Sequence, residues 1–464
     1  MRWNILPKGV RVGLLAGLLA MLPAAPALAK VHTTELENGM TVLVETDRRA
    51  PTVVSQVWYG VGSSYEPGGI TGVSHILEHM MFKGTEEVGP GEFSRIIKRL
   101  GGRENAFTGR DYTAYFEQLA ADQLDRALEL EADRMVNLRL DPEEFASERD
   151  VVMEERRLRT EDQPAARLRE AFNATAWMAS PYGQPIIGWM DDLANMELND
   201  LQGWYERFYT PANATLVVVG DVEPGAVFAA ARRHFGDLEG GEAPTIKPRR
   251  EPDQTGPREV VVRVPARVPQ VRAGYKVPAL NTAAERDDAY ALEVAAGLLA
   301  GGDSARLPRR LVREREIAAS ASAGYGLYDR MDTLFTLTGT PSENTEPRDL
   351  VAALREEARA LAEGEIEADE LERVKAQVVA SEVYQRDSQF YKAMRRGLTE
   401  TVGLGWEVVD EYADRVEAVT AEDVRRVAEE YFREDRLTVA ILEPEGSGPA
   451  PQQQPSTGGM THGN

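Results

Sequence analysis

An internal repeat restricts the fold of this chain more than any other feature of its sequence. A helical pattern of apolar residues leads into a short apolar strand over 198–219, and the same order returns 223 residues later. The matching residues are Leu201, Trp204, Phe208, Leu216 and Val218 in the first copy and Val424, Val427, Tyr431, Val439 and Ile441 in the second. A chain of 464 residues also suits two domains of roughly 200 residues better than one. The sequence therefore predicts an α+β protein of two homologous halves, each a mostly antiparallel sheet with helices packed on one face.

A stretch rich in glycine, proline and charged residues separates the two copies. Because these residues interrupt regular structure, we expect a linker over 239–257. We assign 30–240 to an N-terminal domain, 241–257 to the linker and 258–445 to a homologous C-terminal domain. Residues 446–464 are rich in Gly, Pro, Gln and Ser, and we expect them to be a disordered tail.

The first 29 residues have the pattern of a signal peptide. Basic residues precede an apolar run from Val12 to Leu22, and small residues stand at Ala27 and Ala29, which places cleavage before Lys30. The run is too short to span a bilayer comfortably, so we expect no transmembrane segment in the mature chain. These features predict a periplasmic or secreted protein.

Composition argues against one class of partner and rules out chemistry that needs cysteine. The net charge of −23 argues against nucleic acid as a partner, because nucleic acid is held mainly through Lys and Arg. The chain has no cysteine, which rules out both disulfides and a thiol nucleophile.

The motif His75-Ile76-Leu77-Glu78-His79 holds two of the five histidines in the chain. On a helix, His75 and His79 lie one turn apart on the same face, so both imidazoles can reach one metal ion. Glu78 flanks that face and can hold a water beside the metal. This H-x-x-E-H order is a known zinc peptidase signature. The alternative is a pair of surface histidines beside an acid on an amphipathic helix.

A catalytic zinc usually takes three protein ligands, so a third must come from elsewhere in the chain. The predicted helix over 142–159 carries Glu148, Glu154 and Glu155. Glu148 and Glu155 are seven positions apart and share one face of that helix. Glu154 is rotated by about 100° from Glu155 and is expected to pair with a neighbouring arginine on the surface.

The second copy of the repeat lacks the metal motif. Aligning the residues that follow the motif places Glu293, Ala296 and Gly297 where His75, Glu78 and His79 stand in the first copy. One half is therefore expected to carry the catalytic residues, and the other is expected to be an inactive homologue.

Several segments taken together resemble the pitrilysin/insulinase family of zinc peptidases. They are H-I-L-E-H followed by M-M-F-K-G-T, then E-N-A-F-T, E-R-D-V-V-M-E-E, S-P-Y-G-Q-P-I-I-G and Y-T-P-A-N-A-T-L-V-V-V-G-D. The resemblance runs from about Lys30 to Pro444. This half-length chain is most similar to bacterial members and to the catalytic subunit of the mitochondrial processing peptidase.

The resemblance implies one zinc ion per chain and the residues that bind it. In the family the third ligand follows the second histidine by 76 or 77 positions. The 76 positions from His79 to Glu155 therefore assign Glu155 to this role. Glu148 matches a second acid of the family, which orients a ligand or the base during catalysis.

The resemblance also implies a zinc endopeptidase acting on extended or unfolded peptides. Glu78 would be the general base that takes a proton from the attacking water. Asn105 and Ala106 match the strand that pairs with the substrate peptide. For these two residues, an ordinary core hairpin is the alternative.

One departure from the family pattern indicates which partner subunit the chain would need. Members usually hold the substrate with an Arg and a Tyr seven positions apart in the non-zinc half, and Val312 and Ala319 occupy those places here. The resemblance thus implies a heterodimer with a non-zinc homologue that carries the Arg and Tyr, and a homodimer remains an alternative. A non-catalytic assembly subunit of the same family is the alternative function.

Overall fold

The computed structural model describes residues 30–247 and 249–447. The signal peptide predicted for 1–29 and the tail beyond 447 lie outside these residues. None of the helices in the described ranges is both long and apolar enough to traverse a lipid bilayer.

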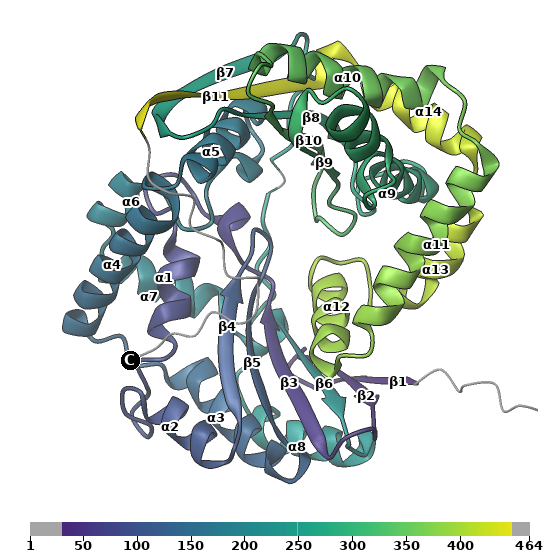
Figure 1. Ribbon diagram of the computed structural model, residues 1–464. Helices are drawn as coiled ribbons and strands as arrows, with labels where there is room; N and C mark the ends of the chain where they lie inside the picture. The colour runs from purple at the N-terminus through teal and green to yellow at the C-terminus, as the bar shows by residue number, and fades with distance from the viewer. Residues whose placement is uncertain (1–29, 248, 448–464) are drawn as a thin grey trace, which may run out of the picture.

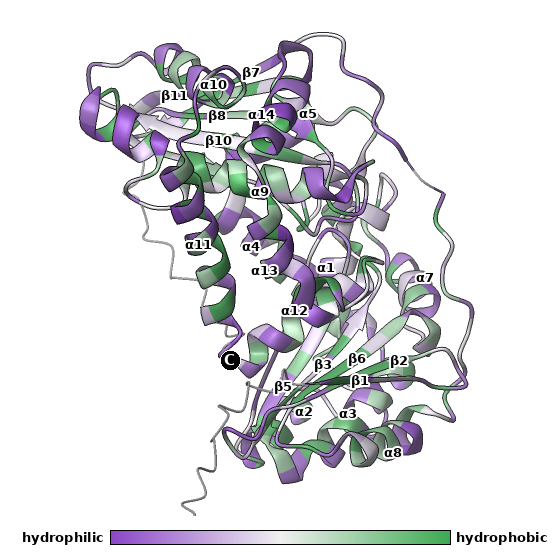
Figure 2. Cartoon of the chain, turned by 90° about the vertical axis from the view of Figure 1, so that its right-hand side faces the viewer, coloured by the Kyte–Doolittle hydropathy of each residue, from purple (hydrophilic) through white to green (hydrophobic). Residues whose placement is uncertain are grey.

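The N-terminal half is built on a six-stranded sheet (Figure 1). Its strands are β1 (Val31–Glu35), β2 (Thr41–Thr46), β3 (Thr52–Tyr59), β4 (Arg103–Thr108), β5 (Thr113–Ala120) and β6 (Ala214–Gly220). The order is β1-β2-β6-β3-β5-β4, in which only the β2–β6 pair is parallel. The predicted hairpin at Asn38-Gly39 joins β1 to β2, and Gly39 adopts the left-handed conformation that this turn needs. Figure 2 shows hydrophobic residues along β2 and β6.

Eight helices complete this half in the part of the chain that the structure describes. They are α1 (Val73–Met80), α2 (Glu92–Arg99), α3 (Leu124–Asn137), α4 (Pro142–Arg156), α5 (Pro164–Ala176), α6 (Met190–Asn195), α7 (Leu198–Phe208) and α8 (Pro224–Phe235). Asp141 caps α4 by accepting hydrogen bonds from the Glu143 and Glu144 amides. The helix predicted to reach residue 159 ends at Arg156 and continues as a π-helical turn, Arg157–Glu161.

The C-terminal half repeats the design with five strands. They are β7 (Arg258–Ala266), β8 (Gln270–Val277), β9 (Ala318–Gly324), β10 (Thr333–Pro341) and β11 (Leu437–Ser447), in the order β7-β11-β8-β10-β9. Only β7–β11 is parallel. Its helices are α9 (Arg286–Ala300), α10 (Pro347–Glu363), α11 (Ala368–Gln385), α12 (Gln389–Thr401), α13 (Val408–Ala418) and α14 (Ala421–Tyr431).

The end of β11 corrects one predicted boundary. Residues 446 and 447, assigned above to the disordered tail, belong to β11. The backbone of Ser447 pairs with Ala266 in β7, so the neighbouring strand supplies hydrogen bonds that composition could not reveal.

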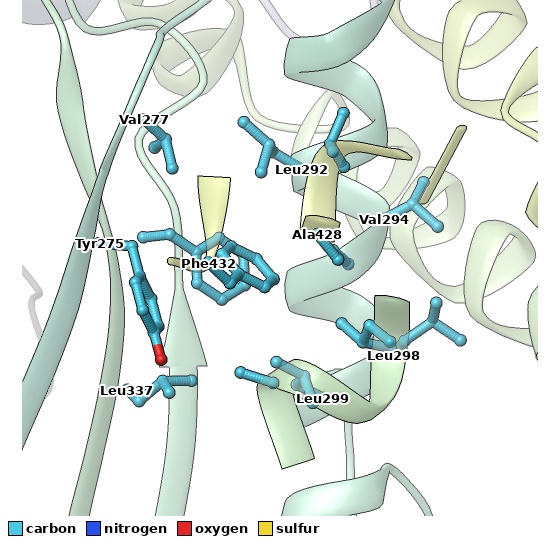
Figure 3. Close-up of a cluster of buried hydrophobic side chains, with 14 of the residues drawn as sticks. Tyr275, Val277, Leu292, Val294, Leu298, Leu299, Leu337, Ala428 and Phe432 are labelled. Carbon is cyan, nitrogen blue, oxygen red and sulfur yellow. The ribbon is translucent and has the colours of Figure 1, made fainter. Parts of the chain in front are cut away.

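Each sheet packs its own helices on one face, as predicted. In the C-terminal half, Tyr275 and Val277 of β8 face Leu292, Leu298 and Leu299 of α9 across a closely packed core (Figure 3). This apolar core fixes α9 against the sheet, and the corresponding core of the N-terminal half fixes α1.

The second face of each sheet is covered by a helix from the other half, which the repeat did not predict. Helix α5 packs on β7 and β11, and α12 packs on β3 and β6 (Figure 1). The α12 contact depends on Gly397, because a Cβ there would lie 2.1 Å from Trp58 Nε1. The apolar residues on this face of the N-terminal sheet include Leu43, Val54, Trp58, Val217 and Val219. Strands that are apolar on both faces therefore require a second covering layer.

Polar contacts also join the halves. Arg396 of α12 donates to Glu45 of β2 at 2.8 Å, and both side chains are buried. Elsewhere, Arg330 donates to Asp111 at 2.9 Å and to Ser64 at 2.8 Å. Buried ion pairs with satisfied hydrogen bonds hold one relative orientation of the packed elements.

Candidate metal centre

The position of α1 is set by the glycine-rich loop before it. Gly72 precedes the helix with φ +90°, and a Cβ there would lie 2.5 Å from the Ile187 carbonyl oxygen. The buried carboxylate of Glu66 accepts hydrogen bonds from the Gly72 amide at 2.7 Å and the Ser74 amide at 2.9 Å. Burial raises the pKa of Glu66 to about 7, although these amides oppose the shift. Glu66 therefore satisfies the first amides of α1 and fixes its start.

Helices α1 and α4 pack together and bring His75, His79 and Glu155 to one point. Glu155 Oε2 lies 3.5 Å from His79 Nε2 and 3.9 Å from His75 Nε2. One donor atom from each residue lies within 4.8 Å of the others, and no other such group occurs in the described part of the chain. Two imidazoles and a carboxylate form a donor set that zinc accepts in catalytic sites. The structure thus places together the three residues predicted as ligands.

Glu148 lies behind His79 and fixes its orientation. Its carboxylate is 3.1 Å from His79 Nδ1, while its other oxygen pairs with Lys83. Nδ1 therefore faces Glu148, and Nε2 faces Glu155. Burial lowers the pKa of His79, but hydrogen bonds with the two carboxylates outweigh it and raise that pKa to about 9. An acid behind a histidine ligand is a common arrangement around protein-bound metals.

Glu78 is buried beside this group and accepts a hydrogen bond from the Thr108 hydroxyl at the end of β4. Burial raises the pKa of Glu78 to about 7, and the charge of Glu155 adds to the shift. The carboxylate of Glu155 also pairs with Arg159. Burial opposes a low pKa for Glu155, but His79, His75 and Arg159 together hold it at about 2.

Four residues around the centre were missed by the sequence analysis: Glu66, Lys83, Thr108 and Arg159. Arg159 follows Glu155 by four positions, a helical spacing that could have been noticed. Thr108 comes from a strand distant in sequence, so no local pattern could connect it to Glu78. Glu154 is exposed and pairs with Arg157 at 3.0 Å, as predicted.

Asn105 and Ala106 lie in β4, the outermost strand of the N-terminal sheet. The Asn105 side chain accepts a hydrogen bond from the Ala106 amide at 2.9 Å. Because β4 ends at Thr108, this outer strand leads directly to Glu78.

Comparison with known proteins agrees with this fold and donor set. Residues 41–189 match the family described as Insulinase (Peptidase family M16), and 195–378 match the Peptidase M16 inactive domain. The chain therefore belongs to the insulinase family of peptidases, M16, which confirms the predicted resemblance.

The similar proteins cover nearly the whole chain. It is 35% identical to the zinc protease PqqE of Helicobacter pylori, over 94% of this chain and 98% of that protein. It is 27% identical to the uncharacterized zinc protease YmxG of Bacillus subtilis, over 89% and 98%. A crystal structure of a Helicobacter pylori protease matches with TM-score 0.84 and 33% identity, covering 90% of this chain and 100% of that one. These relatives support a peptidase, and two of them are named as zinc proteases.

Proposed function

We propose that this protein is a zinc-dependent endopeptidase that hydrolyses extended or unfolded peptides, with one zinc ion per chain. The observation that carries the proposal is the convergence of His75, His79 and Glu155 on one point, with Glu78 buried beside them. A non-catalytic assembly subunit would have no need of a general base next to a complete set of metal ligands.

Each residue then has a defined task. His75, His79 and Glu155 would hold zinc. When bound, zinc would act as a Lewis acid that polarises a peptide carbonyl and lowers the pKa of water. Glu78 takes the proton from the attacking water and passes it to the leaving amine nitrogen. Glu148 keeps the His79 ring oriented through Nδ1, and Thr108 holds the Glu78 carboxylate in place.

The substrate is proposed to add to the sheet as a further strand. Peptides that pair with a sheet edge gain main-chain hydrogen bonds and need no particular side chain for them. β4 is the outermost strand, and its Asn105–Ala106 segment lies two to three positions before Thr108. An extended peptide bound there would bring a carbonyl toward Glu78. Most strands of a folded protein are already paired within a sheet, whereas an extended or unfolded chain has its backbone groups free, which favours such chains as substrates.

Replacing Glu78 by Gln tests the proposal. The variant should fold and retain zinc, while kcat for an unstructured peptide falls by about 10²- to 10⁴-fold, the usual size of a general acid–base contribution. Glu293→Gln is the matched control, since Glu293 stands at the corresponding helix of the other half and its replacement should leave turnover unchanged. Near-native turnover by the Glu78 variant would remove this residue from the mechanism.

We further propose that the mature protein works in the periplasm or outside the cell, paired with a non-zinc homologue. Val312 is half-buried against the core of its own half, and Ala319 is exposed in β9, so neither can replace the family's Arg and Tyr. The isolated chain should bind zinc but cleave peptides weakly, and a partner carrying Arg and Tyr should restore the rate. Vigorous cleavage that the partner does not change would favour a self-sufficient homodimer.

A further inference from the structure

Three arginines from three distant segments lie close enough, where the two halves face each other, for the charges of Arg110 and Arg169 to act on Arg272. Arg110 lies in the turn between β4 and β5, Arg169 on α5, and Arg272 on β8. The Arg272 guanidinium lies 5.5 Å from the Phe172 ring of α5, and the Arg110 guanidinium lies 4.9 Å from the Tyr182 ring. Helix α5 packs against the C-terminal sheet (Figure 1). Arg169 precedes Phe172 on this helix by three positions, and its charge acts on Arg272.

This cluster lacks compensating negative charge. Across residues 30–247 and 249–447, no carboxylate lies within ion-pair distance of any of the three guanidinium groups, although the chain has 76 acidic residues against 53 basic ones. Burial and the charges of Arg169 and Arg110 lower the pKa of Arg272 to about 10, which still leaves it positive at neutral pH. Three like charges held together repel one another, and an anion bound between them would relieve that repulsion.

The nearby acids are engaged elsewhere. Asp111 accepts hydrogen bonds from Arg330, Ser64 and Tyr182. Asp329 lies in the field of Arg110, but its carboxyl accepts a hydrogen bond from Thr333, and burial raises its pKa. Asp111 is thus paired with Arg330, and Asp329 acts on Arg110 only from beyond ion-pair distance.

One member of the cluster, Arg110, comes from the strand end that reaches the candidate metal centre. Arg110 follows Thr108, which bonds Glu78, by two positions, so their Cα atoms are at most about 8 Å apart. Arg272 pairs in register with Thr338 of β10, which in turn pairs with Ser322 of β9. On the other side Arg272 pairs with Ala440 of β11, which pairs with Val260 of β7. Side chains opposite one another on paired strands share a face of the sheet, so Arg272 is the only charged side chain in this row.

We propose that Arg110, Arg169 and Arg272 form a subsite that binds a carboxylate of the peptide substrate, a few residues from the bond to be cleaved. This proposal rests on the proposed peptidase function and adds a substrate class. Guanidinium groups bind carboxylates through paired, charge-assisted hydrogen bonds, which suits either a C-terminal carboxylate or an Asp or Glu side chain. The net charge of −23 repels acidic peptides at long range, so selection depends on this local cluster.

The test measures binding and cleavage with three versions of one unstructured decapeptide that carries an uncharged coumarin label. The first is neutral with an amidated C-terminus, the second has a free C-terminal carboxylate, and the third is amidated with one Asn replaced by Asp. In the full-length Glu78→Gln protein, we expect at least one carboxylate peptide to bind about tenfold more tightly than the neutral one, as charge-assisted hydrogen bonds would give. The second and third peptides distinguish the two sources of the carboxylate.

Arg272→Gln and Arg169→Gln, each added to the Glu78→Gln protein, should reduce this preference about tenfold toward equal affinities. Arg167→Gln, on the same exposed stretch of α5, is the matched control and should retain the preference. Because Arg169 is exposed and Arg272 is repelled by its neighbours, neither change should lower the melting temperature.

The outcomes separate this proposal from the peptidase function. Equal affinity for all three peptides, or a preference that survives both arginine changes, would overturn the carboxylate subsite even if the wild-type protein cleaves peptides. A preference that depends on Arg272 and Arg169 would support the subsite even if the wild-type protein shows no turnover.

Discussion

The two halves share one scaffold but differ at one contact between two helices, which is α1 with α4 in the N-terminal half and α9 with α11 in the C-terminal half. In the N-terminal half, α1 and α4 pack with His75, His79, Glu148 and Glu155 between them. In the C-terminal half, α9 and α11 are the corresponding packed pair, and they meet through Gly297. A Cβ on Gly297 would lie 2.7 Å from Val374 Cγ1 and 3.0 Å from Val378 Cγ2.

The difference shows how the same fold supports or excludes a metal centre. Valine side chains occupy the space of the donors in the C-terminal half, and Gly297 allows them to approach the backbone of α9. Glu293, at the position of His75, is half-buried and accepts a hydrogen bond from the Tyr412 hydroxyl at 3.3 Å. The same scaffold therefore occurs with and without a set of donor residues, and the side chains at the helix contact determine whether donors converge.

We expect the largest effect when a residue of the donor set in the N-terminal half is changed. Glu155→Gln should lower zinc affinity by well over the roughly 10- to 100-fold that loss of a supporting residue costs. Zinc content of the purified protein should then fall clearly below one per chain. Glu154→Gln is the matched control, because Glu154 is exposed and pairs with Arg157. Stoichiometric zinc in both variants would show that the third ligand is another residue.

We expect a smaller effect, on stability, when the packing between α9 and α11 in the C-terminal half is changed. Gly297→Ala should destabilise the protein by about 1 kcal/mol, because overpacking costs about 1–3 kcal/mol and the better helix propensity of Ala returns about 1 kcal/mol. Thermal unfolding measures the change, and it should be partly reversed in the Gly297→Ala, Val374→Ala double variant. A stabilised single variant would show that the two helices can separate freely.

We expect the smallest effect on stability when a contact of the segment that connects the two halves is changed. Glu251 pairs with Lys276 of β8 and accepts hydrogen bonds from the Ala179 and Ser180 amides. Burial raises the pKa of Glu251, but these partners outweigh it and hold the pKa at about 2, below its ordinary value of 4.5. The folded state thus binds the proton more weakly than the unfolded state, so this stabilisation is complete above pH 4.5 and is lost as pH falls toward 2.

Glu251→Gln should therefore lower the free energy of unfolding by less than about 1 kcal/mol at pH 7, because the Gln oxygen can still accept the amide hydrogen bonds and only the charge of the pair is lost. The deficit relative to wild type should shrink at pH 3. Glu242→Gln, at an exposed position in the same connecting segment, is the control. A deficit that is equal at both pH values would mean that the carboxylate charge contributes little.

The sequence predicted a large part of the fold and of the candidate site. The spacing of His75 and His79 placed both on one helix face, and the repeat predicted two sheets of similar design. These features are encoded by local periodicity and by fixed helix geometry, which a single sequence shows directly. Glu148 and Glu155 were two of three candidate acids on one helix, and the family resemblance assigned Glu155 as the ligand.

Only the tertiary structure decided the contacts between segments that are distant in the chain. Thr108 reaches Glu78 from the end of a strand, α5 and α12 cover the sheets of the opposite halves, and three arginines gather from both halves. No periodic pattern records such contacts, because they depend on how complete elements pack against one another. The sequence by itself determined the helices, the strands and the H-x-x-E-H motif, and the packing determined which polar groups surround that motif.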